Sequence, residues 1–397
     1  MPHAPSHALG VTILSLHTSP LAQPGSGDAG GMNVFVLQSA LALARRGAHV
    51  NIFTRSRASW TRSPAPGVRV FGLPAGGDRH LSKEELRSIT DEFAHRVASH
   101  PHFDPNAAVH SHYWLSGLSA MSLQESTGRG FAHTMHTTAA AKHRHAPGAH
   151  VDLERLDAEA LIASAAGVLT ANTHADRAEL LADFDVSPER VRVVSPGIDT
   201  SVFTPDGPVA PWPLSTPGPR LLFAGRIQPY KGPQVAIGAV GRLAKRGISA
   251  SLVLLGDRSG QGAQDPAALA ASAGVASRVL SLPPVPQHEL AAWFRAADAV
   301  LMPSKHETYG LVAAEALACG TPVLGHDVGG LSTLIRDGVD GRLLRELDPE
   351  TWAQAVADWG QDGVPDTWST AAAQAGRARG WETTAAALET AYARLLG

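Results

Sequence analysis

The feature that most constrains the fold is a regular alternation of short apolar or β-branched runs with longer helical segments. Strands that alternate with helices are typical of βαβ units and of a mostly parallel sheet. In the first half of the chain, the expected strands are Val11–Leu16, His49–Thr54, Val68–Leu73, Ala107–His112, Phe131–His136, Val168–Asn172 and Val191–Ser195.

Three segments have sequence patterns that predict a helix. Asn33–Arg46 has apolar residues at helical spacing and stops at Gly47. Ser82–Ala98 opens with Ser82 and has Glu85 three residues later, which predicts a capping box. Trp368–Leu396 is rich in alanine and is predicted to be helical.

A proline-rich stretch, Ser195–Pro219, breaks the alternation once and is typical of a linker. The strands expected after it are Arg220–Ala224, Ser251–Leu255, Val279–Leu282, Ala299–Pro303, Pro322–His326 and Gly341–Leu344. We therefore expect an α/β fold with two Rossmann-like, doubly wound domains facing across a cleft. The expected parts are a domain at 1–200, a hinge at 201–219, a domain at 220–375 and a final helical segment at 376–397 that packs back on the first domain.

Composition narrows the class of protein. The 397 residues include 33 basic and 36 acidic ones, so the chain has no excess of positive charge. The composition therefore does not favour a nucleic acid or an anionic membrane as partner. The single cysteine, Cys319, excludes intramolecular disulfides. No apolar run approaches the roughly 18 residues that span a bilayer, and Met1–Gly10 lacks the pattern of a secretory signal. A cytoplasmic protein is expected.

A glycine-rich loop, Gly25–Asn33, matches the dinucleotide fingerprint G-x-G-x-x-G literally. That fingerprint should follow its strand at once and have an acidic residue about twenty positions later. Here eight residues intervene, His17–Pro24, and the next strand ends in Phe53–Ser56 without an acid. An NAD(P)-binding protein, with Arg55 or Arg57 serving a 2′-phosphate, stays as an alternative. The favoured interpretation is a glycine turn that opens a helix at Met32 or Asn33 and binds an anionic or polyhydroxyl ligand.

Two motifs follow strands of the second half. Arg226 and Lys231 come directly after the strand Arg220–Ala224, where two cations can converge on a diphosphate. Glu307 follows Ala299–Pro303, and Glu315 lies within an apolar helical run, where a carboxylate needs a partner such as a ligand hydroxyl.

Histidine pairs end two expected strands of the first half, in His110–Trp114 and His133–Thr137. A zinc site is one interpretation, although no third ligand is evident. Hydrogen bonding to a substrate is favoured, and packed core histidines remain an alternative.

Together, Gly225-Arg226-x₄-Lys231, Glu307-x₇-Glu315 and Ser195-Pro196-Gly197-x-Asp199 resemble the GT-B glycosyltransferases of family 4, which are retaining enzymes that use nucleotide sugars. The resemblance covers nearly the whole chain. It implies catalysis without a required cofactor by His136, Arg226, Lys231 and Glu307, with the charge of a departing UDP neutralised by the two cations.

A narrower match lies in His17–Gly25, Asp28–Asn33, Leu81–Leu86, His110–Gly117 and His136-Thr137. These segments are similar to the family members that transfer N-acetylglucosamine from UDP-N-acetylglucosamine to 1D-myo-inositol 3-phosphate. The resemblance implies that the donor binds Gln23, Pro24, Gly31, Arg226, Lys231, Val285, Glu307 and Glu315. It implies that the acceptor binds His17, Asp28, Ala29, Gly30, Gly31, Met32, Asn33, Lys83, Tyr113, Thr137 and Arg155.

The sequence departs from the family at His306, Thr308, Tyr309 and Tyr230, and the segment after Thr137 is short. These differences bear on the sugar and the acceptor; a lipid-linked inositol, a sugar phosphate or a hydroxy acid are alternative acceptors. A non-catalytic nucleotide-sugar-binding protein and a homodimer are further alternatives. The resemblance also suggests a magnesium ion near Phe294, Arg295, Ala297 and Thr321.

Overall fold

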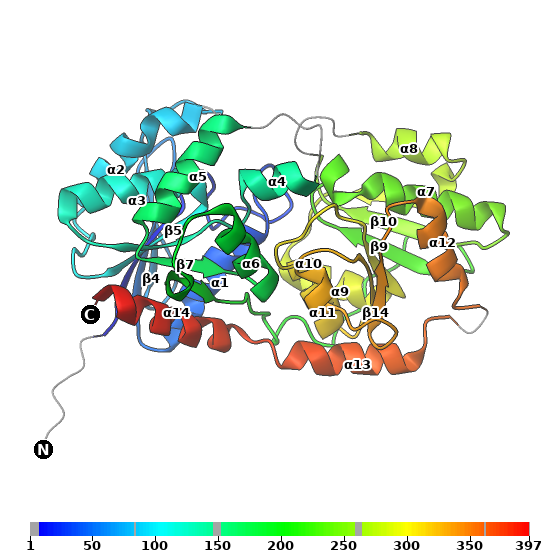
Figure 1. Cartoon of the computed structure of the whole chain (residues 1–397). Helices are drawn as coiled ribbons and strands as arrows, with labels where there is room; N and C mark the ends of the chain where they lie inside the picture. Colours follow the sequence, from blue (N-terminus) through cyan, green and yellow to red (C-terminus); the bar gives the residue numbers. More distant parts are fainter. Residues whose placement is uncertain (1–7, 83–84, 146–151, 259–263, 361–362, 397) are drawn as a thin grey trace, which may run out of the picture. The chain divides into compact units, whose positions relative to one another are not determined.

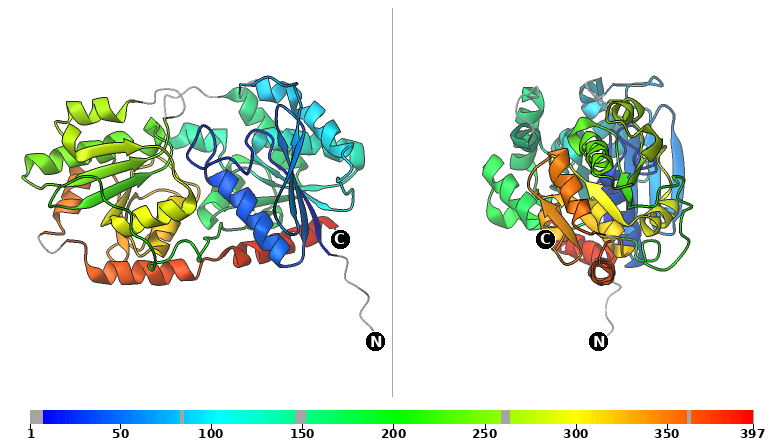
Figure 2. Two further views of the ribbon diagram at one scale, coloured as in Figure 1. Left: turned by 180° about the vertical axis from the view of Figure 1, so that it is seen from behind. Right: turned by 90° about the vertical axis from the view of Figure 1, so that its right-hand side faces the viewer.

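The computed structural model describes residues 8–82, 85–145, 152–258, 264–360 and 363–396, and it is shown in Figures 1 and 2. The contacts within the chain divide it into two units. The first combines the residues up to Ala22 with Met32–Gly197 and the segment from Trp381 onward. The second combines Gln23–Gly31 with Ile198–Gly380. A short piece of the N-terminal sequence therefore belongs to the second unit.

The first unit contains an eight-stranded sheet in the order β3-β4-β2-β1-β5-β6-β7-β8. Its strands are β1 (Gly10–Leu14), β2 (His49–Arg55), β3 (Trp60–Ala65), β4 (Val68–Leu73), β5 (Ala108–His112), β6 (Phe131–Thr134), β7 (Val168–Ala171) and β8 (Val191–Val193). Every strand expected in this half is confirmed. The edge strand β3, antiparallel to β4, was not predicted because its mostly exposed residues form no apolar run.

The second unit contains a parallel six-stranded sheet in the order β11-β10-β9-β12-β13-β14. Its strands are β9 (Arg220–Ala224), β10 (Ser251–Leu255), β11 (Val279–Leu282), β12 (Ala299–Met302), β13 (Val323–His326) and β14 (Gly341–Leu344). This is the strand order of a Rossmann sheet. The order reverses between β9 and β12, and in the first sheet between β1 and β5. Loops after such strands diverge and leave room for a ligand.

Helices connect the strands of each sheet. Those of the first unit are α1 (Gly31–Arg45), α2 (Thr90–Ala98), α3 (Tyr113–Thr127), α4 (Ala139–His145), α5 (Leu153–Ala165), α6 (His174–Asp183) and α14 (Trp381–Leu396). Those of the second are α7 (Pro233–Lys245), α8 (Pro266–Ser272), α9 (Gln287–Ala296), α10 (Leu311–Ala318), α11 (Leu331–Leu334), α12 (Pro349–Ala357) and α13 (Asp366–Arg377).

The last helix, α14, completes the first unit (Figure 1). It packs on β5, β6 and β7, and Tyr392 is fully buried there. Arg45 Nε lies 2.9 Å from Glu382 Oε1, and Arg46 Nη2 lies 2.7 Å from Glu389 Oε2, so two ion pairs join α14 to the last residue of α1 and the residue after it. Burying a large side chain stabilises a fold by about 1.5–3 kcal/mol. The return of α14 is therefore part of the core of this unit.

The proline-rich stretch 201–219 has no helix or strand, as expected, but it is packed on the second unit. Phe203 is 2% exposed and lies in the core beside Phe294. Arg295 donates through Nη1 to the Thr204 carbonyl oxygen at 2.8 Å and through Nε to that of Pro208 at 2.7 Å. The chain passes from the first unit to the second between Gly197 and Ile198, ahead of this stretch.

Two helix predictions are refined. The capping box is confirmed, because Ser82 N donates to Glu85 Oε2 at 2.7 Å and Glu85 N donates to Ser82 Oγ at 3.3 Å. A 3₁₀ turn, Glu85–Ile89, then precedes α2. The single helical segment expected over Trp368–Leu396 is instead two helices, α13 and α14, separated by 378–380. Within the described ranges, no helix is long and apolar enough to cross a membrane.

Candidate functional site

Two residues of the first unit adopt a left-handed backbone although neither is glycine. Tyr113 has φ of 71° directly after β5, and His136 has φ of 59° shortly after β6. Such a conformation costs about 1–3 kcal/mol and is concentrated at functional sites. Both lie at carboxyl ends of parallel strands, where a doubly wound sheet binds its ligands.

An aromatic and cationic cluster surrounds Tyr113. The ring centroids of Tyr113 and His17, which follows β1, are 4.5 Å apart. The guanidinium carbon of Arg155, on α5, lies 4.9 Å from the centroid of the Tyr113 ring, a cation–π contact. Three residues expected at an acceptor site thus meet at the reversal between β1 and β5.

Arg155 is held by Glu159 one turn later on α5. Its Nε lies 2.6 Å from Glu159 Oε1, and the two side chains are 5% and 0% exposed. Arg155 Nη2 also donates to the Thr137 carbonyl oxygen, and Glu159 Oε2 accepts from Ala139 N at 2.8 Å. Burial raises the pKa of Glu159, and the charge of Arg155 opposes that rise. This buried pair ties the turn that contains Thr137 to α5.

Four histidines lie in or directly after β5 and β6, and two of them bond to other residue types. His110 Nδ1 lies 2.7 Å from Tyr392 Oη, and its Nε2 lies 2.8 Å from Thr134 Oγ1. His133 Nδ1 lies 2.8 Å from Ser111 Oγ. Burial lowers the pKa of His110 to about 3, so it stays neutral at physiological pH. The described residues contain no group of three or more His, Cys, Asp or Glu placed to hold a metal, so they form no zinc site.

The other two histidines bond to each other. His112 Nδ1 lies 2.9 Å from His136 Nε2, and the ring of Phe35 covers both. Burial lowers the pKa of His136 to about 3 and that of His112 well below its ordinary value. The pair is therefore neutral.

In the second unit, Lys231 and Glu307 form an ion pair. Lys231 Nζ lies 2.6 Å from Glu307 Oε1, and the side chains are 24% and 12% exposed. Ser304 Oγ donates to the same carboxylate oxygen at 2.8 Å. Because Lys231 follows β9 and Glu307 follows β12, the pair marks the reversal point of this sheet.

Glycines allow these loops to approach closely. A Cβ on Gly232, which has φ of 77°, would lie 2.0 Å from the Pro303 carbonyl oxygen. A Cβ on Gly329 would lie 2.1 Å from the Glu307 carbonyl oxygen, which accepts from Gly330 N at 2.7 Å. Side chains at these positions would push Lys231 and Glu307 apart.

Glu315 lies in the second turn of α10 and is 5% exposed. Burial raises the pKa of its carboxyl group to about 8, while a hydrogen bond with the Gln287 side chain acts in the opposite direction. The carboxyl group is therefore mostly protonated at neutral pH and able to both donate and accept hydrogen bonds.

The segment Gln23–Gly31 joins the second unit through several contacts. Gln23 Nε2 donates to the Val285 carbonyl oxygen at 2.7 Å, and Asp257 N donates to the Gly25 carbonyl oxygen at 3.2 Å. A Cβ on Gly30 would lie 3.9 Å from Arg226 Nε, and one on Gly31 would lie 3.3 Å from Leu311 Cδ1. Residues expected to bind the donor are thereby brought together although they are far apart in sequence.

The expected acceptor loop Asp28–Asn33 is divided between the units. Asp28, Ala29, Gly30 and Gly31 belong to the second unit, whereas Met32 and Asn33 belong to the first. Asn33 Nδ2 donates to Thr18 Oγ1 at 2.9 Å and to the Ser19 carbonyl oxygen at 2.7 Å, which fixes the loop after β1. Lys83 lies outside the described residues.

The residues at the suggested magnesium position bond to one another and to a neighbouring segment. Thr321 Oγ1 donates to the Phe294 carbonyl oxygen at 2.7 Å, and each oxygen keeps a lone pair for a further partner. The guanidinium of Arg295 bonds to Thr204 and Pro208 and carries a positive charge in the same region. Mg²⁺ prefers six oxygen ligands in octahedral geometry, several of them waters. We derive no catalytic step through a metal here.

Several partners of the expected residues were missed. Gln287 and Tyr392 bond to Glu315 and His110 from remote parts of the sequence, and no local pattern indicates them. Ser304, which bonds to Glu307, lies only three residues before it but was not singled out. Glu159 could have been assigned as the partner of Arg155, because residues four apart on a helix face each other.

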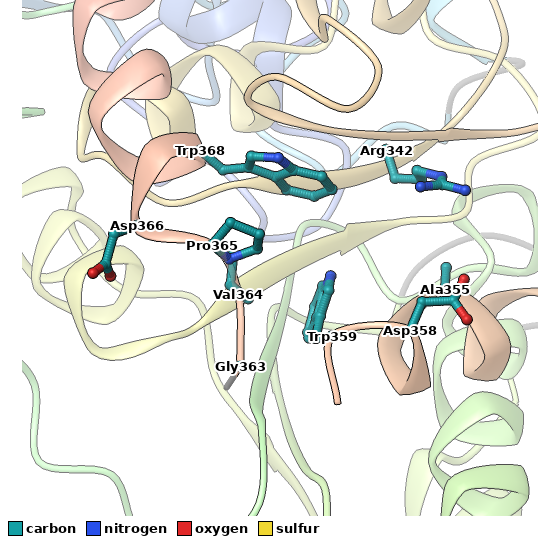
Figure 3. A pocket seen from close by; sticks show the side chains of 9 residues that line it. All are labelled: Arg342, Ala355, Asp358, Trp359, Gly363, Val364, Pro365, Asp366 and Trp368. Carbon is teal, nitrogen blue, oxygen red and sulfur yellow. The ribbon is translucent and has the colours of Figure 1, made fainter. Parts of the chain in front are cut away.

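A separate cavity of about 440 Å³ lies in the second unit between the end of α12 and the start of α13 (Figure 3). Its lining includes Trp359, Trp368, Pro365, Arg342 and Asp358. None of the residues expected to bind donor or acceptor lines it, so it is distinct from the candidate site.

Known proteins resemble the chain over its whole length. The model of the group 1 glycosyl transferases matches residues 210–378, and the glycosyl transferase 4-like domain matches residues 30–197. The chain is 41% identical to a D-inositol 3-phosphate glycosyltransferase from Paenarthrobacter aurescens, covering 96% of this chain and 97% of the relative. It is 44% identical to the protein of the same name from Stackebrandtia nassauensis, covering 87% of this chain and 82% of the relative. Among solved structures, sucrose-phosphate synthase from Thermosynechococcus elongatus matches with a TM-score of 0.85 at 26% identity, covering 98% and 99% of the two chains.

Proposed function

Because the chain belongs to the GT-B glycosyltransferases of family 4, in the group of the D-inositol 3-phosphate glycosyltransferases, we propose that it transfers N-acetylglucosamine from UDP-N-acetylglucosamine to 1D-myo-inositol 3-phosphate. Support comes from relatives of that name that match nearly the full length of the chain. The single observation that carries the acceptor is the cluster of His17, Tyr113 and Arg155 at the β1–β5 reversal.

The second unit binds the donor in this proposal. Arg226 and Lys231 bind the diphosphate, and Lys231 exchanges its partner Glu307 for a phosphate oxygen. Glu307 then accepts from hydroxyls of the transferred sugar, and Glu315 bonds to the ribose hydroxyls. Val285 holds the uracil through its main chain, beside Gln23 and Pro24, and Gly31 lies near the donor.

The first unit binds the acceptor. Arg155 and Lys83 neutralise the acceptor phosphate, together with hydrogen bonds from Tyr113 and Thr137. A guanidinium has five N–H donors, so Arg155 can bind a phosphate while keeping its bonds to Glu159 and Thr137. His17 and the loop Asp28–Asn33 contact the inositol ring.

The reaction proceeds with retention of configuration. The acceptor hydroxyl oxygen forms a bond to the anomeric carbon on the face from which UDP leaves, and the bond from that carbon to the diphosphate oxygen breaks. A donor phosphate oxygen takes the hydroxyl proton. Arg226 and Lys231 stabilise the charge that develops on UDP, which is the main contribution to rate. His136 positions the transferred sugar, and no metal is required.

A donor and acceptor screen with the purified full-length protein tests the proposal. We expect UDP release from UDP-N-acetylglucosamine that depends on 1D-myo-inositol 3-phosphate, and an α-linked product by NMR. Release with free inositol, with a lipid-linked inositol or with another sugar phosphate alone would overturn the acceptor assignment. A β-linked product would overturn the retaining mechanism.

A further inference from the structure

His112 lies where the sheet of the first unit meets the strained turns. It is the last residue of β5 and is fully buried. Its backbone is extended, with φ of −121° and ψ of 125°, and it immediately precedes Tyr113 with its left-handed backbone. Two rings pack against its own, because the centroid of the His110 ring lies 4.1 Å and that of the Phe35 ring 5.7 Å from the His112 centroid.

The hydrogen bond between His112 and His136 links their protonation. His112 Nδ1 and His136 Nε2 are 2.9 Å apart, and both rings are neutral because burial lowers both pKa values. A neutral imidazole carries one N–H, so one ring donates in this bond and the other accepts. If His112 donates through Nδ1, the proton of His136 lies on Nδ1. If His136 donates through Nε2, the proton of His112 lies on Nε2.

The remaining nitrogen of His112 decides between these arrangements. His112 Nε2 is buried and has no hydrogen-bond partner within the part of the chain that the structure describes. A proton there would be a buried donor without an acceptor, which is rarer and costlier than a bare acceptor nitrogen. The favoured arrangement therefore places the His112 proton on Nδ1.

We infer that His112 is a positioning residue that fixes the proton of His136 on Nδ1, so that His136 meets the substrates as a hydrogen-bond donor. This inference rests on the proposed function, in which His136 positions the transferred sugar. In this form Nδ1 of His136 donates to a sugar oxygen and takes no proton from the acceptor. That role agrees with the transfer of the hydroxyl proton to a donor phosphate oxygen.

The first test observes the rings directly. The full-length protein is labelled with ¹⁵N, and long-range proton–nitrogen correlations of the histidine rings identify which nitrogen carries hydrogen. The signals of His136 are assigned by their loss in His136→Gln. We expect Nδ1 of His136 to be protonated and Nε2 to be unprotonated; the reverse pattern would overturn the inference. This measurement needs no turnover, so it decides the inference even if the proposed transfer fails.

The second test separates positioning from packing. His112→Leu removes the donor, and His112→Asn restores an N–H near the place of Nδ1. His133→Leu is the matched control, because His133 is equally buried and bonds to Ser111 instead of His136. A buried hydrogen-bonding group left without its partner typically costs about 10- to 100-fold. We expect that loss in kcat for His112→Leu with an unchanged donor KM, recovery of most of it in His112→Asn, and near wild-type kcat in His133→Leu. Equal losses in all three variants, or none in His112→Leu, would overturn the inference.

Discussion

Replacing Glu315 by glutamine should stabilise the protein at alkaline pH and leave it almost unchanged at pH 5. The folded protein keeps the Glu315 proton up to about pH 8, whereas the ordinary pKa of the group is 4.5. The folded state therefore binds more protons than the unfolded state between these values. By linkage, the free energy of unfolding falls as the pH rises through this window. Glutamine cannot ionise, so in Glu315→Gln this decrease in the free energy of unfolding with pH is absent.

The size of the effect follows from the shift. Each pKa unit corresponds to about 1.4 kcal/mol, and the contribution of Glu315 to stability falls by about 3 kcal/mol between pH 5 and pH 8. For a unit of this size, a change of 1 kcal/mol moves Tm by about 2–4 °C. The variant should thus exceed the wild type in Tm by about 6–12 °C at pH 8.

The assay is a thermal melt of the full-length wild type and Glu315→Gln at pH 5, 6, 7 and 8, without ligand. The decisive quantity is the difference in Tm between the two proteins as a function of pH. Glu289→Gln serves as a control, because Glu289 is exposed. If the difference for Glu315→Gln stays constant across the series, Glu315 ionises normally in the folded protein, and the reasoning from its burial is wrong.

Four further outcomes are expected. Lys83→Ala should raise the KM for the phosphorylated acceptor much more than the KM for the donor in steady-state assays, and equal effects would remove its assigned role. Lys231→Ala should weaken UDP binding by about 10- to 100-fold in calorimetry, since a hydrogen bond to a charged group contributes about 1.5–3 kcal/mol. A chelator should leave the rate of transfer unchanged, and recovery by added Mg²⁺ after a loss would contradict a metal-independent reaction. Burial lowers the pKa of His136 to about 3, so its titration should cause no loss of kcat near pH 6.5. The shape of the pH profile of kcat in this range should therefore be the same in the wild type and in His136→Gln, and an acid limb present only in the wild type would contradict the burial of His136.

The strands were predictable because their apolar runs reflect burial on both faces of a parallel sheet. Val68–Leu73 and Ser251–Leu255 match to the residue. The exposed edge strand β3 has no such run and was not predicted. The break between α13 and α14 was missed because the alanine-rich sequence is helical on both sides of 378–380.

For the candidate site, the sequence indicated the residues after each strand but not their partners. Arg226, Lys231 and Glu307 could be placed because strand ends of one sheet meet at one edge. The hydrogen bond of Glu315 to Gln287 connects α10 to α9, and that of His110 to Tyr392 connects β5 to α14; both contacts depend on packing. No spacing rule relates positions so far apart in the chain.

The membership of α14 in the first unit affects the order in which the protein can be made. A ribosome releases β5, β6 and β7 long before it synthesises Trp381–Leu396, so one face of their sheet emerges without its cover. Tyr392, the partner of His110, is translated only after Ile198–Gly380 of the second unit. The first unit therefore cannot complete its fold until the ribosome has synthesised the second unit. A nascent chain stalled before residue 381 should bind chaperones through that uncovered face, and its release should coincide with the emergence of α14.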